Sequence, residues 1–110
     1  MTIRTVKYEL EARLNGRSGR LYSKPSGKLE FKQYDDNGTR LKVSVRNLQV
    51  PEQTMATVMA GDSKIAELEI SHRKGRLDIE PADIPDLLPR QVIRIIVDGN
   101  TLLEGKLYED

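Results

Sequence analysis

The stretch KLEFKQYDDNGTRLKVSVR, residues 28–46, alternates apolar and polar side chains on both sides of a turn signal. A period of two is typical of β-strands that bury one face, and DDNG supplies residues that favour a turn. The stretch therefore predicts a β-hairpin. Its inner side carries Leu29, Phe31, Leu41, Val43 and Val45.

The same alternation continues along the 110 residues, interrupted by turn formers such as Gly61-Asp62 and Asp98-Gly99-Asn100. It predicts about eight short strands in an all-β fold, a single antiparallel β-sandwich over residues 1–110.

Three prolines exclude a strand from residues 81–89, which are expected to form an irregular loop with one helical turn at most. The alternation places these side chains on the inner faces: Tyr8, Leu10, Leu29, Phe31, Leu41, Val43, Val45, Leu68, Ile70, Ile95 and Leu107.

Cations oppose cations in the register that we expect for the hairpin. With residues 35–39 as the loop, Lys32 lies opposite Lys42 and Lys28 lies opposite Arg46. A slip by one residue would turn the apolar side chains outward, so the pattern excludes it. Like charges directly opposed destabilise a sheet, which suggests that the outer side serves a partner.

The two halves of the chain differ in charge. Residues 1–48 hold eleven Lys and Arg against five Asp and Glu, whereas residues 49–110 hold seven against twelve. The cationic face is therefore expected to bind an acidic protein surface or a second copy of the chain. Nucleic acid is the less favoured partner, because the net charge is only +1 and Tyr34 is the one aromatic among these cations. The predicted partner-binding residues are Lys28, Lys32, Tyr34, Arg40, Lys42 and Arg46.

A solvated sheet face without a partner is the competing interpretation of this charge pattern. Glu9, Glu11 and Glu30 are interspersed among the cations, and salt screens what remains.

The residues needed for most enzyme chemistry are scarce. Cysteine is absent, which excludes disulfides, thiolate catalysis and Cys-ligated zinc. The single histidine, His72, is in phase with Leu68 and Ile70 and is expected to cap the inner face at a strand end. Asp83 and Asp86 in the proline-rich segment are expected to cap backbone N–H groups. We therefore expect no enzyme activity, no metal and no organic cofactor.

No apolar run approaches the length of a membrane span, and MTIRTVKYELEARL contains no export signal. The expectation is a soluble protein that does not contact membranes and is cytoplasmic by default.

The chain resembles a group of small, uncharacterised bacterial β-sandwich domains in the order of its motifs. These motifs are LEARLNG, KPSGKLEFKQ, RLKVSVRNLQVPEQT, MAGDSKIAELEI, GRLDIE, IPDLLP and VDGNTLLEGKL. The outline of these domains is similar to chordin-type domains and, more distantly, to copper/zinc superoxide dismutase sandwiches. The resemblance implies a sandwich fold but no dismutase activity, since the metal-binding histidines have no counterparts.

The expected function is that of a non-catalytic structural or protein-interaction module. The alternative is a β-barrel-like domain that binds a small molecule or an anionic ligand such as a polysaccharide or nucleic acid. For a small molecule, binding would depend on inward residues such as Phe31 and Gln33.

Overall fold

Antiparallel strands make up most of the chain in a computed structural model, which describes residues 5–16, 25–81 and 84–109. The all-β prediction is confirmed, with no helix in these ranges, and so none that could cross a membrane. The strands are β1 (Val6–Asn15), β2 (Ser26–Tyr34), β3 (Thr39–Arg46), β4 (Thr54–Ala60), β5 (Ser63–Ile70), β6 (Gly75–Ile79), β7 (Val92–Val97), β8 (Asn100–Lys106) and β9 (Tyr108–Glu109).

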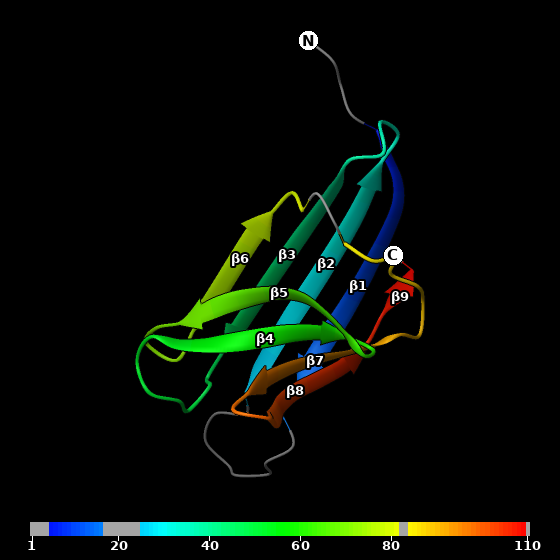
Figure 1. Ribbon diagram of the computed structural model, residues 1–110. Coiled ribbons are helices and arrows are strands. Elements are labelled where there is room, and N and C mark those ends of the chain that lie inside the picture. The colour runs from blue at the N-terminus through cyan, green and yellow to red at the C-terminus, as the bar shows by residue number, and fades with distance from the viewer. Residues whose placement is uncertain (1–4, 17–24, 82–83, 110) are drawn as a thin grey trace.

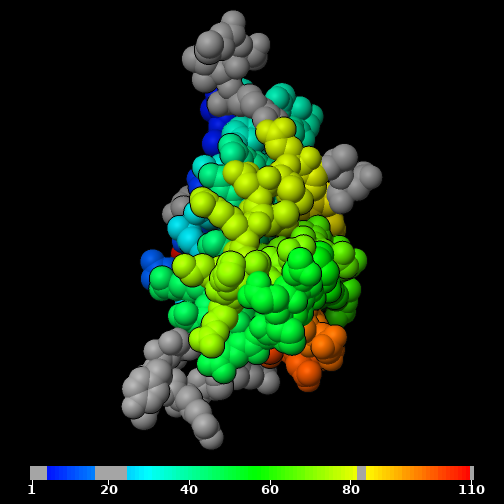
Figure 2. All heavy atoms as spheres, turned by 90° about the vertical axis from the view of Figure 1, so that its left-hand side faces the viewer, coloured from blue at the N-terminus to red at the C-terminus, as the bar shows by residue number. Residues whose placement is uncertain are grey.

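One continuous sheet, rather than the two separate sheets of a sandwich, contains all nine described strands. Its order is β5-β4-β7-β8-β1-β2-β3-β6, and β9 pairs with β1. Figure 1 shows β1, β2, β3 and β6 side by side, with β4, β5, β7 and β8 crossing them. The two edge strands, β5 and β6, lie close together, as Figure 2 shows, and a bridge joins Ser71 and Lys74 in their turn. The sandwich prediction is therefore corrected to a nearly closed barrel.

The sheet stays continuous because β8 approaches β1 closely. Asn15 of β1 pairs with Glu104 of β8. A Cβ atom on the adjacent Gly105 would overlap the carbonyl oxygen of Arg13. Glycine at this position therefore lets the two groups of strands remain joined where they cross.

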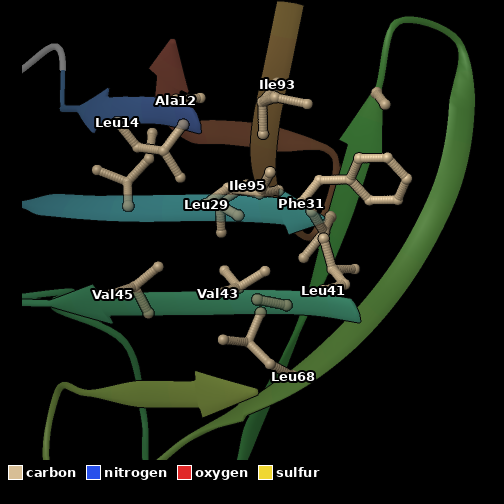
Figure 3. Packing of buried hydrophobic residues seen from close by; sticks show 14 of the residues in the cluster. Ala12, Leu14, Leu29, Phe31, Leu41, Val43, Val45, Leu68, Ile93 and Ile95 are labelled. Atoms are coloured by element: carbon tan, nitrogen blue, oxygen red, sulfur yellow. The ribbon is translucent and has the colours of Figure 1, made fainter. Parts of the chain in front are cut away.

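The core fills the space between the crossing strands (Figure 3). All the predicted inner residues except Tyr8 are buried, and Tyr8 is half-buried against the core. Leu87 is also buried and brings the proline-rich segment into the core. The buried apolar side chains are Leu10, Ala12, Leu14, Leu29, Phe31, Leu41, Val43, Val45, Leu48, Ala56, Val58, Ala60, Leu68, Ile70, Leu87, Ile93, Ile95, Val97, Leu103 and Leu107.

The register of the β2–β3 hairpin differs from the predicted one by two residues. Phe31 pairs with Leu41, and the Tyr34 N–H donates to the Gly38 carbonyl at 2.9 Å. Asn37 has φ 67°, the left-handed conformation that Asn tolerates, so a shorter loop than residues 35–39 closes the hairpin. A shift of two leaves every side chain on its predicted side, which is why the apolar pattern did not exclude it.

Two loop predictions have different outcomes. The prediction for His72 is wrong: its side chain is exposed, and its backbone turns at φ 54° between β5 and β6. The described part of residues 81–89 forms neither strand nor helix, as expected from its prolines. Asp86 is exposed and caps no helix there, and Asp83 lies outside the described residues.

Candidate functional site

The outer side of β1, β2, β3 and β6 carries charged side chains in rows that run across the strands. Paired residues of neighbouring strands point to the same side of the sheet, so the register fixes each row. Two rows are Glu9–Lys32–Arg40 and Glu11–Glu30–Lys42–Asp78. The next two are Arg13–Lys28–Ser44–Arg76 and Asn15–Ser26–Arg46.

The first two rows form a neutralised end, in which three cations meet four carboxylates. Arg40 donates two hydrogen bonds to Asp78, at 2.9 and 2.8 Å. These bonds lower the pKa of Asp78. They also raise the pKa of Arg40, to which a hydrogen bond with Tyr34 makes a smaller contribution. Lys32 lies 3.8 Å from a carboxylate oxygen of Glu9. The predicted opposition of Lys32 to Lys42 does not occur, because Lys42 pairs with Glu30 and Asp78.

The last two rows form what we call the basic end: Arg13, Lys28, Arg46 and Arg76, with Ser44 among them. All four cations are exposed, and these rows contain no carboxylate. In the described chain, no carboxylate lies within ion-pair distance of Arg13, Arg46 or Arg76. The positive charge of the face is therefore concentrated at one end.

Lys28 connects the two ends. Its amine lies 3.0 Å from Glu30 and 3.3 Å from Glu11, two carboxylates of the neighbouring row. Hydrogen bonds to Glu30 and then Glu11 raise the pKa of Lys28. Its charge is thus largely compensated within the protein. Among the described residues, the three arginines have no carboxylate at ion-pair distance: Arg46 donates a hydrogen bond to the Ser26 hydroxyl, and Arg76 contributes only a minor, longer-range part of the lowered pKa of Asp78.

Ser44 lies at the centre of the basic end, and its four nearest neighbours on this side are cations. Lys42 and Arg46 lie two residues away along β3, and Lys28 and Arg76 lie opposite on the adjacent strands. The short serine side chain leaves open hollows of about 160, 230 and 540 Å³ on its flanks. The hollow of about 230 Å³, between Lys28 and Arg46, has no carboxylate in its lining, so an acceptor group that entered it would meet hydroxyls and cationic donors. Glu30 and Asp78 line the smallest hollow, and Glu69 lines the largest.

No protein-family model matches the chain, and no curated protein sequence matches it. The resemblance to bacterial β-sandwich and chordin-type domains therefore stays a prediction.

The six predicted partner-binding residues lie on one face but at two ends. Lys28 and Arg46 belong to the basic end, whereas Lys32, Tyr34, Arg40 and Lys42 are closer to the carboxylates. The sequence pattern did not indicate that Arg13 and Arg76 lie beside the hairpin. Their strands alternate in the right phase, but nothing in the sequence shows that β6 pairs with β3 beside Ser44.

Groups suited to metal binding are lacking in the described part of the chain, where no three His, Asp or Glu side chains gather to hold an ion.

Proposed function

We propose that this protein is a non-enzymatic interaction module that binds an acidic surface of another protein through its basic end. The observation that carries the proposal is the pair of rows through Ser44 and Arg46, which contain four cations and no carboxylate.

A protein surface suits this site better than a nucleic acid. Stacking of bases needs aromatic side chains beside the cations. On the described outer face Tyr34 lies beside Arg40 and Tyr108 lies beside Glu11, so both aromatics adjoin the neutralised end rather than Ser44. The row through Ser44 crosses four adjacent strands, about 15 Å at the usual strand spacing. This is the scale of a small cluster of Asp and Glu side chains on a partner.

The charges should contribute mainly to the rate and selectivity of association. Exposed ion pairs contribute about 0.2–1 kcal/mol each, and salt weakens them. Binding is therefore expected to fall steeply between about 0.02 and 0.3 M salt, because the screening length becomes shorter than the width of the basic end.

An acidic peptide is a suitable probe of this proposal. An N-acetylated octaglutamate peptide would be titrated into ¹⁵N-labelled protein, and a thymidine octanucleotide would be titrated in parallel. We expect the peptide to shift amide signals around Ser44, Arg46 and Arg76. Arg46→Gln/Arg76→Gln should weaken its affinity about five-fold, which corresponds to roughly 1 kcal/mol for two exposed contacts.

The matched control is Lys7→Gln/Lys64→Gln, which removes the same charge from exposed positions outside the basic end, in β1 and in the β4–β5 hairpin. Its affinity should stay close to that of the wild type. Equal losses of peptide affinity in both double variants would mean that net charge alone attracts the peptide. Tighter binding of the oligonucleotide than of the peptide would indicate that the partner is a nucleic acid. Either result would reject the proposal.

A further inference from the structure

A pocket of about 290 Å³ lies on the inner side of the sheet, away from the basic end. Its floor is a row of three paired residues, Tyr8 of β1, Gln33 of β2 and Thr39 of β3, with Phe31 beside them. Its wall is the segment 84–88 of the connection between β6 and β7, which passes the ends of these strands (Figure 1).

The wall is anchored through Leu87 and Leu88, and Pro81, which precedes it in the chain, is held to β3, so the pocket is formed before any ligand arrives. The Thr39 hydroxyl donates to the Pro81 carbonyl at 3.0 Å. Leu87 is buried in the core, and the Leu88 N–H donates to the side-chain oxygen of Gln91 at 3.2 Å. A preformed concave site avoids the entropic cost of ordering a loop on binding.

The pocket combines apolar surface with negative charge. Rings of Tyr8 and Phe31 line it together with aliphatic side chains, and Asp86 contributes a carboxylate. A second carboxylate, Glu109, pairs with Leu10 and so lies on the inner side of the sheet. Burial, followed by the Glu109 charge, raises the pKa of the Tyr8 hydroxyl. None of the nine described lining residues is basic.

We propose that this pocket binds a small aromatic amine. Asp86 would pair with the ammonium group, the two rings would contact the aromatic body, and the Gln33 amide would offer a further hydrogen bond. At about 290 Å³ the pocket lies at the lower end of the size range of small-molecule sites, which suits a ligand with a single ring. The site does not depend on the proposed function, because it lies on the opposite side of the sheet.

The test uses three probes that share a phenyl ring: 2-phenylethylamine, 2-phenylethanol and 3-phenylpropanoate. Each would be titrated into ¹⁵N-labelled protein. We expect 2-phenylethylamine to shift the amide signals of Tyr8, Gln33 and residues 84–88, and to bind at least about five-fold more tightly than the alcohol. Nα-acetyl-lysine amide, which mimics a lysine side chain of a protein, tests whether the pocket binds any primary amine. We expect it to bind more weakly than 2-phenylethylamine because it lacks a ring.

Asp86→Asn should weaken the binding of 2-phenylethylamine about five-fold and leave the binding of the alcohol unchanged. Asp86 is exposed, so the variant should fold normally, which its amide spectrum would verify. Asp62→Asn, an exposed carboxylate in the β4–β5 turn, is the control that should behave like the wild type. Unshifted pocket amides, equal affinities for the three phenyl probes, or tighter binding of the lysine amide would overturn the proposal. So would an Asp86→Asn variant that binds 2-phenylethylamine as tightly as the wild type.

Discussion

Glu52, in the connection between β3 and β4, forms hydrogen bonds with the connection between β5 and β6. Its carboxylate accepts a hydrogen bond of 2.7 Å from the His72 backbone N–H and one of 3.0 Å from the Ser71 hydroxyl. The bond from His72, followed by that from Ser71, lowers the pKa of Glu52 from its ordinary value of 4.5. The positive φ of His72 turns its N–H toward this carboxylate, so the exposed histidine acts mainly through its backbone, and its side chain makes the smallest contribution.

The lowered pKa predicts a specific pH dependence. A carboxyl group with a lowered folded-state pKa stabilises the protein above its unfolded pKa, and it loses this contribution as the pH falls through the folded pKa. Glu52→Gln should therefore lower the urea midpoint at about pH 7 and differ little from the wild type at about pH 2. Urea unfolding at both pH values would test this, with Asp62→Asn as an exposed control. A deficit of equal size at both pH values would contradict the assigned role of the charge.

At the scale of the element, the β2–β3 hairpin has a register that can be measured directly. Because the chain has no cysteine, introduced pairs report on their own positions alone. Glu30→Cys/Lys42→Cys joins directly opposed residues and should form a disulfide readily. Lys32→Cys/Lys42→Cys, opposed in the register expected from sequence, joins diagonal positions about 7–8 Å apart and should oxidise poorly. The two oxidation rates under the same conditions would decide between the registers.

The hairpin also shows which features can be predicted from sequence. Alternation is local, so it placed Leu29, Phe31, Val43 and Val45 on the buried side correctly. The register depends on one backbone conformation at Asn37, and a shift of two residues changes no side. The charge pairs depend on the register, which is why the expected contacts between cations were wrong while the charged face itself was found.

At the scale of the whole molecule, closure of the barrel depends on the contact between β8 and β1. A methyl group on Gly105 would overlap the Arg13 carbonyl, and backbone on both sides cannot move away easily. Gly105→Ala should therefore destabilise the protein by about 3 kcal/mol, as overpacking does at its upper range.

Gly99→Ala is the comparison for this substitution, because a Cβ there has open space and only the φ of 78° opposes it. It should cost about 1 kcal/mol. Urea unfolding of both variants would measure the difference. Equal losses would show that β1 and β8 adjust without strain.

The basic end and the pocket both depend on the long-range arrangement of strands that forms the barrel. This limits how much of either can be predicted from the sequence. Arg13 and Arg76 are 63 positions apart, and only the strand order β1-β2-β3-β6 brings them to one row. The pocket depends in the same way on segment 84–88 passing the ends of β1, β2 and β3. No local pattern encodes either arrangement.

Each cation of the basic end comes from a different strand: Arg13 from β1, Lys28 from β2, Arg46 from β3 and Arg76 from β6. The surface is therefore a conformational epitope, and a synthetic peptide of residues 28–46 carries only half of its cations. A partner that recognises it distinguishes the native chain from an unfolded one, and by mass action it adds to the stability of the state that it selects. Binding at the basic end would thus serve as a sensor of folding, lost on heating at the temperature where the barrel itself unfolds.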